Sequence, residues 1–312
     1  MKMKDIIKGI IIVGLFAVPF IALIIPIGMF FPFITGKGFV FRILIEIIFG
    51  LFVVLCFMDG QCRPKFSWIT KAVLFFALAI LLADLLGENV YKSLWSNYER
   101  MEGFVLIAHL VAYYILLSSV FKTREIWNKF FNTSIIASII MSFYGVMQLL
   151  GKITINQGGV RVDATFGNAT YFALYLVFHI FLCLYMLVSS PSKQWRKWAY
   201  SLVIIFETII LYFTATRGAI LGLIGGLFLT GVIIAWKEKD NKILRKSAIW
   251  LIGVVAVIFL GFMSLRQTSL VRSSPVLSRF STLGISEFKN QGRYFIWPMA
   301  IKGTLERPLL GW

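Results

Sequence analysis

The chain alternates long apolar windows with short segments of charged, Gly, Pro or Asn residues. Each window has about 17 to 25 residues, the length that a helix needs to cross the hydrocarbon core of a bilayer. The windows cover residues 10–31, 39–58, 68–86, 104–121, 130–150, 171–188, 198–215, 219–236 and 248–265. This pattern predicts an all-α, polytopic membrane helix bundle of about nine transmembrane helices. The first window is too long to be a cleaved signal peptide.

Lysine and arginine are distributed unevenly between the loops. With the N-terminus in the cytoplasm, every inside segment holds more of them than any short outside loop, as the positive-inside rule requires. Composition agrees with a membrane protein, since 59% of the residues are hydrophobic and only 14% are charged. The net charge of +17 therefore reflects membrane topology, and we exclude a nucleic-acid partner.

We expect residues 1–265 to form the bundle and residues 266–312 to begin a large external loop. Nine crossings from an inside start leave this polar segment outside, and long segments translocate despite their charge. Residues 294–305 have helical spacing of apolar residues interrupted by Pro298, which predicts a short, bent interfacial helix. No polar tail or closing helix follows, so we expect a C-terminally incomplete protein.

Few ionisable residues fall within the apolar windows, where a charge costs about 3 kcal/mol on insertion scales. Arg42 and Glu46 are four residues apart, which predicts a neutralising pair on one helix face, with a direct substrate role as the alternative. Glu207 has no such neighbour, so it either faces a polar cavity or is protonated. His109 and His179 are expected to be neutral and hydrogen-bonded to neighbouring helices.

The sequence contains one pattern that predicts close helix packing. Gly218, Gly222 and Gly226 recur every four residues in the eighth window. Small residues at this spacing let two backbones approach closely. We therefore predict a close helix contact along this stripe.

Polar residues precede several helices at the end expected outside. Asn168 or Thr170 is predicted to cap the sixth transmembrane helix, and Thr216 the eighth. The first turns then present amides and the positive end of the helix dipole, which bind phosphate readily.

Four arginines lie in the same outer segments: Arg100, Arg161, Arg217 and Arg293. A planar guanidinium can hold two phosphate oxygens at once. We therefore expect a diphosphate at the level of the lipid headgroups. The alternative for any single arginine is contact with lipid phosphates or with carbonyl groups.

Four stretches resemble the bacterial O-antigen ligase and polymerase family of membrane glycosyltransferases. They are Tyr-Glu-Arg-Met-Glu-Gly at 98–103, Thr-Phe-Gly-Asn-Ala-Thr-Tyr-Phe-Ala at 165–173, Thr-Ala-Thr-Arg-Gly-Ala at 214–219, and Gly-Arg-Tyr-Phe-Ile-Trp at 292–297 leading to Arg-Pro-Leu-Leu-Gly-Trp at 307–312. The resemblance covers roughly residues 90–312. Ala169 departs from it, because the family commonly has proline there.

The resemblance implies a multi-pass enzyme of the bacterial inner membrane with its site on the periplasmic face. Such an enzyme passes a glycan from undecaprenyl diphosphate to a lipid, glycan or protein hydroxyl during synthesis of lipopolysaccharide or other envelope polysaccharides. The resemblance also implies that Arg217 and Arg293 are catalytic and stabilise the diphosphate as it leaves. From their places beside the helix starts, we expect Arg100, Arg161, Asn168 and Thr216 to bind substrate. The reaction would invert the anomeric carbon. A histidine expected beyond Trp312 would assist the acceptor hydroxyl.

No metal or other cofactor is expected, because no His/Cys cluster has zinc spacing and no glycine-rich phosphate loop follows a strand. Two other functions stay open. A transporter or flippase of polyprenyl-linked sugars would need polar residues along a route through the membrane. A scaffold for envelope assembly would need no arginine cluster on one face.

Overall fold

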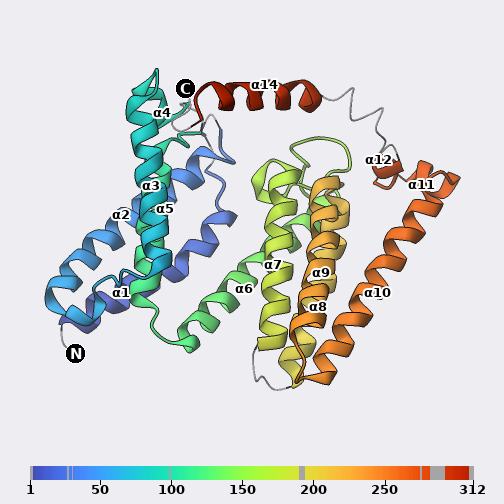
Figure 1. Ribbon diagram of the computed structural model, residues 1–312, viewed down its shortest axis with the longest axis horizontal. Coiled ribbons are helices and arrows are strands. Elements are labelled where there is room, and N and C mark those ends of the chain that lie inside the picture. Colours follow the sequence, from blue (N-terminus) through green and yellow to red (C-terminus); the bar gives the residue numbers. More distant parts are fainter. Residues whose placement is uncertain are drawn as a thin grey trace. The chain divides into compact units, whose positions relative to one another are not determined.

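The computed structural model describes residues 3–26, 28–29, 31–97, 100–189, 194–274, 276–281 and 292–308, and every regular element in this part is a helix (Figure 1). The predicted all-α class is confirmed. The chain forms two compact units, unit 1 with Met1–Ala137 and Gln291–Trp312, and unit 2 with Ser138–Asn290. These units follow packing, whereas the predicted division after residue 265 follows the membrane boundary and stays a prediction.

Unit 1 is built around the first two long helices and α5. Its helices are α1 (Met3–Ala17), η1 (Val18–Leu23), α2 (Thr35–Met58), η2 (Gly60–Cys62), α3 (Trp68–Leu86), α4 (Val90–Trp95), α5 (Phe104–Val120), the first half of α6 (Arg124–Leu149) and α14 (Gly292–Glu306). Leu15, Ile45 and Leu116 are almost fully buried where α1, α2 and α5 meet. The helix predicted around Pro298 is confirmed as α14, which contains that proline.

Unit 2 is a bundle of long helices with short helical turns at one end. Its elements are the second half of α6, η3 (Ala164–Phe166), α7 (Ala169–Ser189), α8 (Gln194–Phe213), α9 (Arg217–Lys237), α10 (Lys242–Leu265), α11 (Ser269–Ser273) and α12 (Ser278–Ser281). Helix α7 packs against α8 and α9, and α9 packs against α10. The loops before α7 and α9 therefore come together at one end of the unit.

Seven helical segments in the described part of the chain are long and apolar enough to cross a membrane: Met3–Leu23, Thr35–Met58, Trp68–Leu86, Arg124–Leu149, Ala169–Ser189, Arg217–Lys237 and Lys242–Leu265. Two predicted spans differ from these. Helix α5 has only 17 residues, and α8 carries Arg196, Lys197 and Glu207. The count of about nine is thus not confirmed.

The first helix ends earlier than its apolar window predicts. The window extends to residue 31, but the helical backbone ends at Leu23, and Ile24 is extended with ψ 129°. Pro19 lies in the final 3-10 turn and Pro26 follows closely. Proline lacks a donor and restricts the residue before it, so hydropathy alone misses this end.

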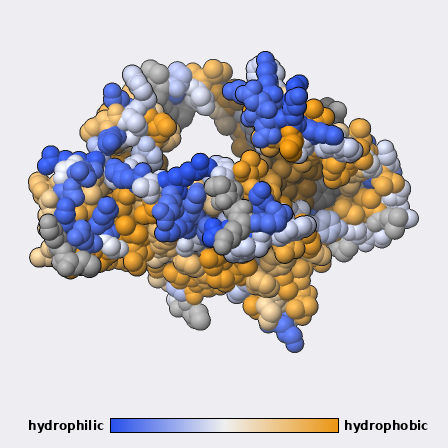
Figure 2. All heavy atoms as spheres, turned by 90° about the horizontal axis from the view of Figure 1, so that it is seen from below, coloured by the Kyte–Doolittle hydropathy of each residue, from blue (hydrophilic) through white to orange (hydrophobic). Residues whose placement is uncertain are grey.

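Large apolar side chains cover the sides of the helices. Phe75 is 74% exposed, Trp250 is 67% exposed and Leu260 is 63% exposed. Figure 2 shows hydrophilic residues gathered on the helix ends that face the viewer, with hydrophobic residues along the sides. Such surfaces fit a lipid bilayer, and they support a multi-pass membrane protein.

The predicted glycine stripe packs at only one of its three positions. No described atom lies within 4 Å of a Cβ built on Gly218 or Gly222, whereas a Cβ on Gly226 would lie 2.6 Å from the ring of Phe181. The close approach of α9 to α10 occurs at Gly231 instead, where a Cβ would meet a side chain of α10 at 2.8 Å. The prediction was wrong for Gly218 and Gly222 because spacing identifies a flat face without saying what covers it.

Candidate functional site

One side chain organises the long loop that connects α6 to α7. Gln148, near the end of α6, is 3% exposed and makes four hydrogen bonds. Its Nε2 donates to Thr154 O (2.9 Å) and to Asp163 Oδ1 (2.7 Å), and its Oε1 accepts from the amides of Asp163 (3.2 Å) and Ala164 (2.8 Å). Both donors and both acceptor positions of the amide are used. Gln148 therefore fixes both ends of the loop.

Asp163 and Gln157 connect the hydrogen-bonded loop to the start of α7. The buried Asp163 accepts the amide of Gln157 at Oδ2 (2.8 Å), and Gln157 Oε1 accepts the amide of Ala169 (2.9 Å). Asn168 Oδ1 accepts the amide of Thr170 (2.8 Å), which confirms the predicted cap on Asn168. The network holds the first turn of α7 at the end of unit 2.

Arg161 joins this loop to the turn between α8 and α9. Its Nε donates to Thr214 O (3.3 Å) and its Nη2 donates to Thr216 Oγ1 (3.3 Å). Beside it, the amide of Val162 donates to Phe213 O (3.2 Å). Two segments about fifty residues apart in sequence are thus pinned together, and Arg161 Nη1 keeps no partner among the described residues.

Thr216 occupies the N-cap position of α9 without capping it. Its hydroxyl is directed to the carbonyl oxygens of Ala169 and Thr214, both at 3.3 Å, while it accepts from Arg161. The predicted capping bond is therefore wrong, because the neighbouring loops compete for the same hydroxyl. The first-turn amides of α9 receive no side-chain cap.

The segment that contains α11 and α12 covers this turn. Val276 packs against Ala215, whose φ of 49° lies in the left-handed region. Arg279 lies three residues after Val276, and it is close enough for its charge to act on Arg161. Burial, and next the positive charge of Arg279, lower the pKa of the Arg161 guanidinium below its ordinary value. Two like charges kept this close favour an anion between them.

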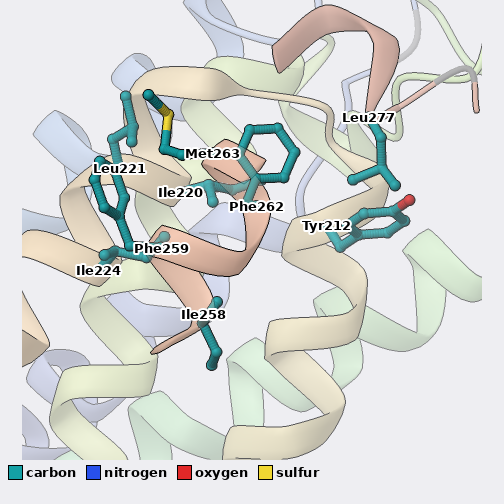
Figure 3. A pocket seen from close by; sticks show the side chains of 9 residues that line it. All are labelled: Tyr212, Ile220, Leu221, Ile224, Ile258, Phe259, Phe262, Met263 and Leu277. Carbon is teal, nitrogen blue, oxygen red and sulfur yellow. The ribbon is translucent and has the colours of Figure 1, made fainter. Parts of the chain in front are cut away.

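An apolar cavity of about 170 Å³ lies along the first half of α9 (Figure 3). It is lined by Tyr212, Ile220, Leu221, Ile224, Ile258, Phe259, Phe262, Met263 and Leu277. Ile220 and Leu221 come one turn after Arg217, the first residue of α9. The hydroxyl of Tyr212 lies 3.5 Å from Ser274 Oγ, at the α11 side of the cavity. A hydrophobic cavity therefore adjoins the cationic end of unit 2.

The C-terminal third of the sequence matches a known family. Residues 200–312 fit the family model described as O-Antigen ligase. This segment of the chain is similar to O-antigen ligases. This confirms the predicted family resemblance and supports a membrane glycosyltransferase that acts in polysaccharide biosynthesis. Comparisons with curated proteins and with solved structures found no match.

The matched segment 200–312 contains Arg217 and Arg293, whereas Arg100 and Arg161 precede it. Unit 2 brings Arg161 into contact with Thr216, next to the half-buried Arg217. Arg100 is exposed in unit 1, ahead of α5. Arg293 also belongs to unit 1, in the first turn of α14, and its side chain lies outside the described atoms. A site shared by Arg217 and Arg293 stays a prediction.

Three contributors to the end of unit 2 were missed from the sequence. Gln148 and Asp163 support the loop, and Arg279 adds a charge. A glutamine in the last turn of an apolar helix is a signal in retrospect, because a buried amide requires partners. Arg279 gave no such signal, because it lies near Arg161 only once Val276 has packed against Ala215.

Glu207 has a partner on another helix. Glu207 is fully buried, and Ser138 donates to its Oε1 (2.5 Å) while Oε2 has no partner among the described residues. This leaves both readings of Glu207 open. Among the described residues, no group of three His, Cys, Asp or Glu could hold a metal ion.

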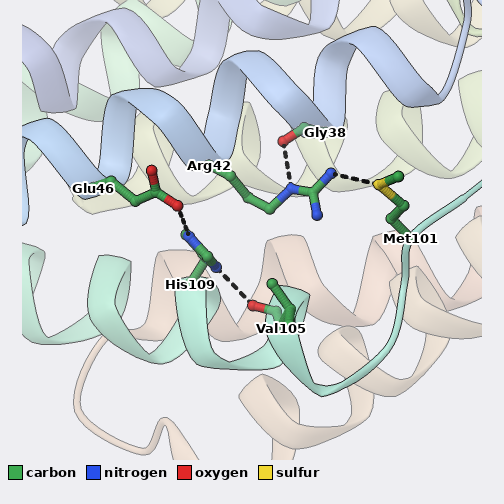
Figure 4. A network of polar contacts seen from close by, with 6 residues as sticks. All are labelled: Gly38, Arg42, Glu46, Met101, Val105 and His109. Atoms are coloured by element: carbon green, nitrogen blue, oxygen red, sulfur yellow. Dashed lines mark hydrogen bonds and ion pairs between the residues drawn. The ribbon is translucent and has the colours of Figure 1, made fainter. Parts of the chain in front are cut away.

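The predicted Arg42–Glu46 pair is wrong. Glu46 Oε1 lies 3.0 Å from His109 Nε2 on α5, which confirms the predicted bond between this histidine and a neighbouring helix (Figure 4). Arg42 turns back toward the start of α2 and donates from Nε to Gly38 O (3.1 Å). The order of the two residues is the reason, since side chains lean toward the helix N-terminus and a basic residue that precedes an acidic one pairs poorly.

Proposed function

We propose that the protein is an inner-membrane glycosyltransferase of the O-antigen ligase type. It would take a glycan from undecaprenyl diphosphate and pass it to a hydroxyl of a lipid, glycan or protein. The acceptor oxygen would attack the anomeric carbon with inversion, and the bond to the diphosphate would break without help from a metal. The N-terminus would lie in the cytoplasm and the site on the periplasmic face.

One observation carries this proposal. The guanidinium of Arg161 lies beside the charge of Arg279 and the uncapped start of α9, and an apolar cavity follows along the same helix. A polyprenyl diphosphate has the matching parts, an anionic head and a hydrocarbon chain. The head would bind the arginines and first amides, and the chain would enter the cavity.

The residues divide between holding and activating the donor. Arg217 and Arg293 would stabilise the charge that develops on the leaving diphosphate. Arg161 and Thr216 would hold the head and the loops around it, with Asn168 fixing the start of α7. Arg100 would contribute a further charge to substrate binding.

The test is a transfer assay with the full chain in proteoliposomes, a polyprenyl-diphosphate glycan donor and parallel lipid, glycan and protein acceptors. Arg217→Met and Arg279→Met are each expected to lower turnover about tenfold or more, as removal of one charge-assisted contact does. Arg245→Met, a matched change at the opposite end of unit 2, should retain activity. Full activity in both test variants would reject the assignment. Movement of labelled donor across the bilayer without any acceptor would favour a flippase instead.

A further inference from the structure

A buried arginine in unit 1 has only uncharged partners. Arg42 is 6% exposed and lies in the first third of α2. Its Nε donates to Gly38 O, its Nη2 lies 3.6 Å from Met101 Sδ, and its guanidinium stands 4.9 Å from the centre of the Phe39 ring (Figure 4). No described carboxylate forms an ion pair with it. Two of its N–H groups are used and its Nη1 has no described partner.

The nearby Glu46–His109 pair supplies no net counter-charge. His109 Nδ1 lies 2.6 Å from Val105 O, and a carbonyl only accepts, so Nδ1 carries a hydrogen. His109 Nε2 and Glu46 Oε1, 3.0 Å apart, then share one further proton. The pair is either imidazolium with carboxylate or imidazole with carboxylic acid. Both forms are neutral overall, so the positive charge of Arg42 is left uncompensated within the described part of unit 1.

The position of the guanidinium fits the level of lipid headgroups. Its bond to Gly38 O brings it back by one turn toward the helix start, as arginines near membrane surfaces do. Gly38 lies three residues after Thr35, which corresponds to about 4.5 Å along the helix axis. An arginine buried without an anion is costly, and such residues in membrane proteins mark functional sites.

We propose that Arg42 anchors a binding site for the phosphate group of a lipid headgroup. The planar guanidinium offers its remaining donors in a fork that matches two phosphate oxygens. Met101 and Gly103, which precede α5, have restricted conformations. Met101 has a φ of 51°, in the left-handed region, and a Cβ on Gly103 would lie 2.3 Å from Leu94 O. This site belongs to unit 1 and does not depend on the function proposed for unit 2.

The experiment compares phosphate probes on the full chain purified in detergent. The probes are dioctanoyl phosphatidic acid, inorganic phosphate and dioctanoylglycerol, which lacks phosphate. Binding and the unfolding temperature are measured for Arg42→Met and Arg42→Lys. Arg63→Met is the matched control at the other end of α2, where Arg63 Nε donates to Cys56 O (3.2 Å). All variants also carry Arg161→Met, Arg217→Met and Arg279→Met, which remove the described arginines of the anion site proposed for unit 2.

Phosphatidic acid is expected to bind and to raise the unfolding temperature, whereas dioctanoylglycerol is not. Arg42→Met should weaken that binding about ten- to a hundredfold, Arg42→Lys less, and Arg63→Met not at all. Without phosphate, Arg42→Met should unfold at the same or a higher temperature, because it removes an uncompensated buried charge. Equal binding of inorganic phosphate would identify the free ion as a ligand of the same site.

Several outcomes would overturn the proposal. One is unchanged binding of phosphatidic acid in Arg42→Met, and another is its failure to bind at all. A lower unfolding temperature of Arg42→Met in the absence of phosphate would show that Arg42 is structural. An equal loss of stability in Glu99→Gln would identify Glu99, which lies outside the described residues, as the counter-ion.

Discussion

Replacing Gln148 by methionine is expected to release the loop that carries Arg161. The change keeps the length of the side chain and removes all four hydrogen bonds of the amide. Thr154 is exposed, so water can satisfy its carbonyl. Asp163 and Ala164 are fully buried, so one carboxylate oxygen and two amides lose their partners.

The expected loss of folding free energy follows from these three unpaired groups. A buried polar group without a partner costs about 1 to 3 kcal/mol, so three of them cost about 3 to 6 kcal/mol after partial relaxation. Bonds between membrane helices average only about 0.6 kcal/mol because the unfolded state also finds partners. Here the partners are loop groups, so we expect the larger value. It corresponds to a fall in unfolding temperature of about 10 °C or more.

Two measurements check this, the unfolding temperature in detergent and hydrogen exchange of residues 150–168. Gln194→Met, an exposed glutamine at the start of α8, is the control and should change stability by less than about 0.5 kcal/mol. Gln148→Glu should be worse at neutral pH, since it places a second carboxylate beside Asp163, and it should recover on acidification. Unchanged stability and unchanged exchange in Gln148→Met would refute the role given to Gln148.

Three further changes test other parts of the molecule. Ile224→Trp fills the cavity along α9 and should raise the KM for a polyprenyl donor about tenfold. Leu229→Trp, exposed on the same helix, should not raise it, and equal KM values in the two variants would show that the cavity does not bind the donor. Gly103→Ala puts a Cβ 2.3 Å from a backbone oxygen and should cost about 1 to 3 kcal/mol, whereas Gly225→Ala in open space should not destabilise, as thermal unfolding would reveal. The amide of Gln61 and the ammonium of Lys4 lower the pKa of Asp59, so its contribution to stability is present above about pH 4 and lost as the pH falls. Asp59→Asn should abolish that pH dependence of stability, and an identical profile of stability against pH would contradict this.

The hydrophobic pattern predicted the helices better than their ends. The bounds of the apolar window 104–121 agree with those of α5, but α10 begins at Lys242, six residues before its window. A helix continues past the membrane boundary as long as its backbone bonds can form, and hydropathy does not report this. Helix α4 was missed because it is short, although Asn89, which caps it through the amide of Lys92, was a readable signal.

The candidate site was predictable where a residue acts through its own chemistry. The arginines near the starts of helices and the cap on Asn168 follow from residue type and local spacing. The network of Gln148 with Asp163 was not predictable, because its members meet only after the loop has folded. The order of Arg42 and Glu46 on α2 already argued against their pairing, but spacing on one helix could not reveal that His109 on another would contact Glu46.

The anion sites proposed around Arg42 and Arg161 rest on the same physical argument. Arg42 and Arg161 are surrounded by carbonyl, hydroxyl or thioether acceptors, which satisfy the geometry of some N–H groups but carry no charge. For the buried Arg42 above all, an anion would recover this electrostatic cost, as the proposed phosphate site requires. Thr216 follows the same logic, because its hydroxyl holds two loops together and leaves the start of α9 uncapped. A chain selected for stability alone would cap that helix and pair those arginines with carboxylates, so the missing partners argue for oxyanion ligands.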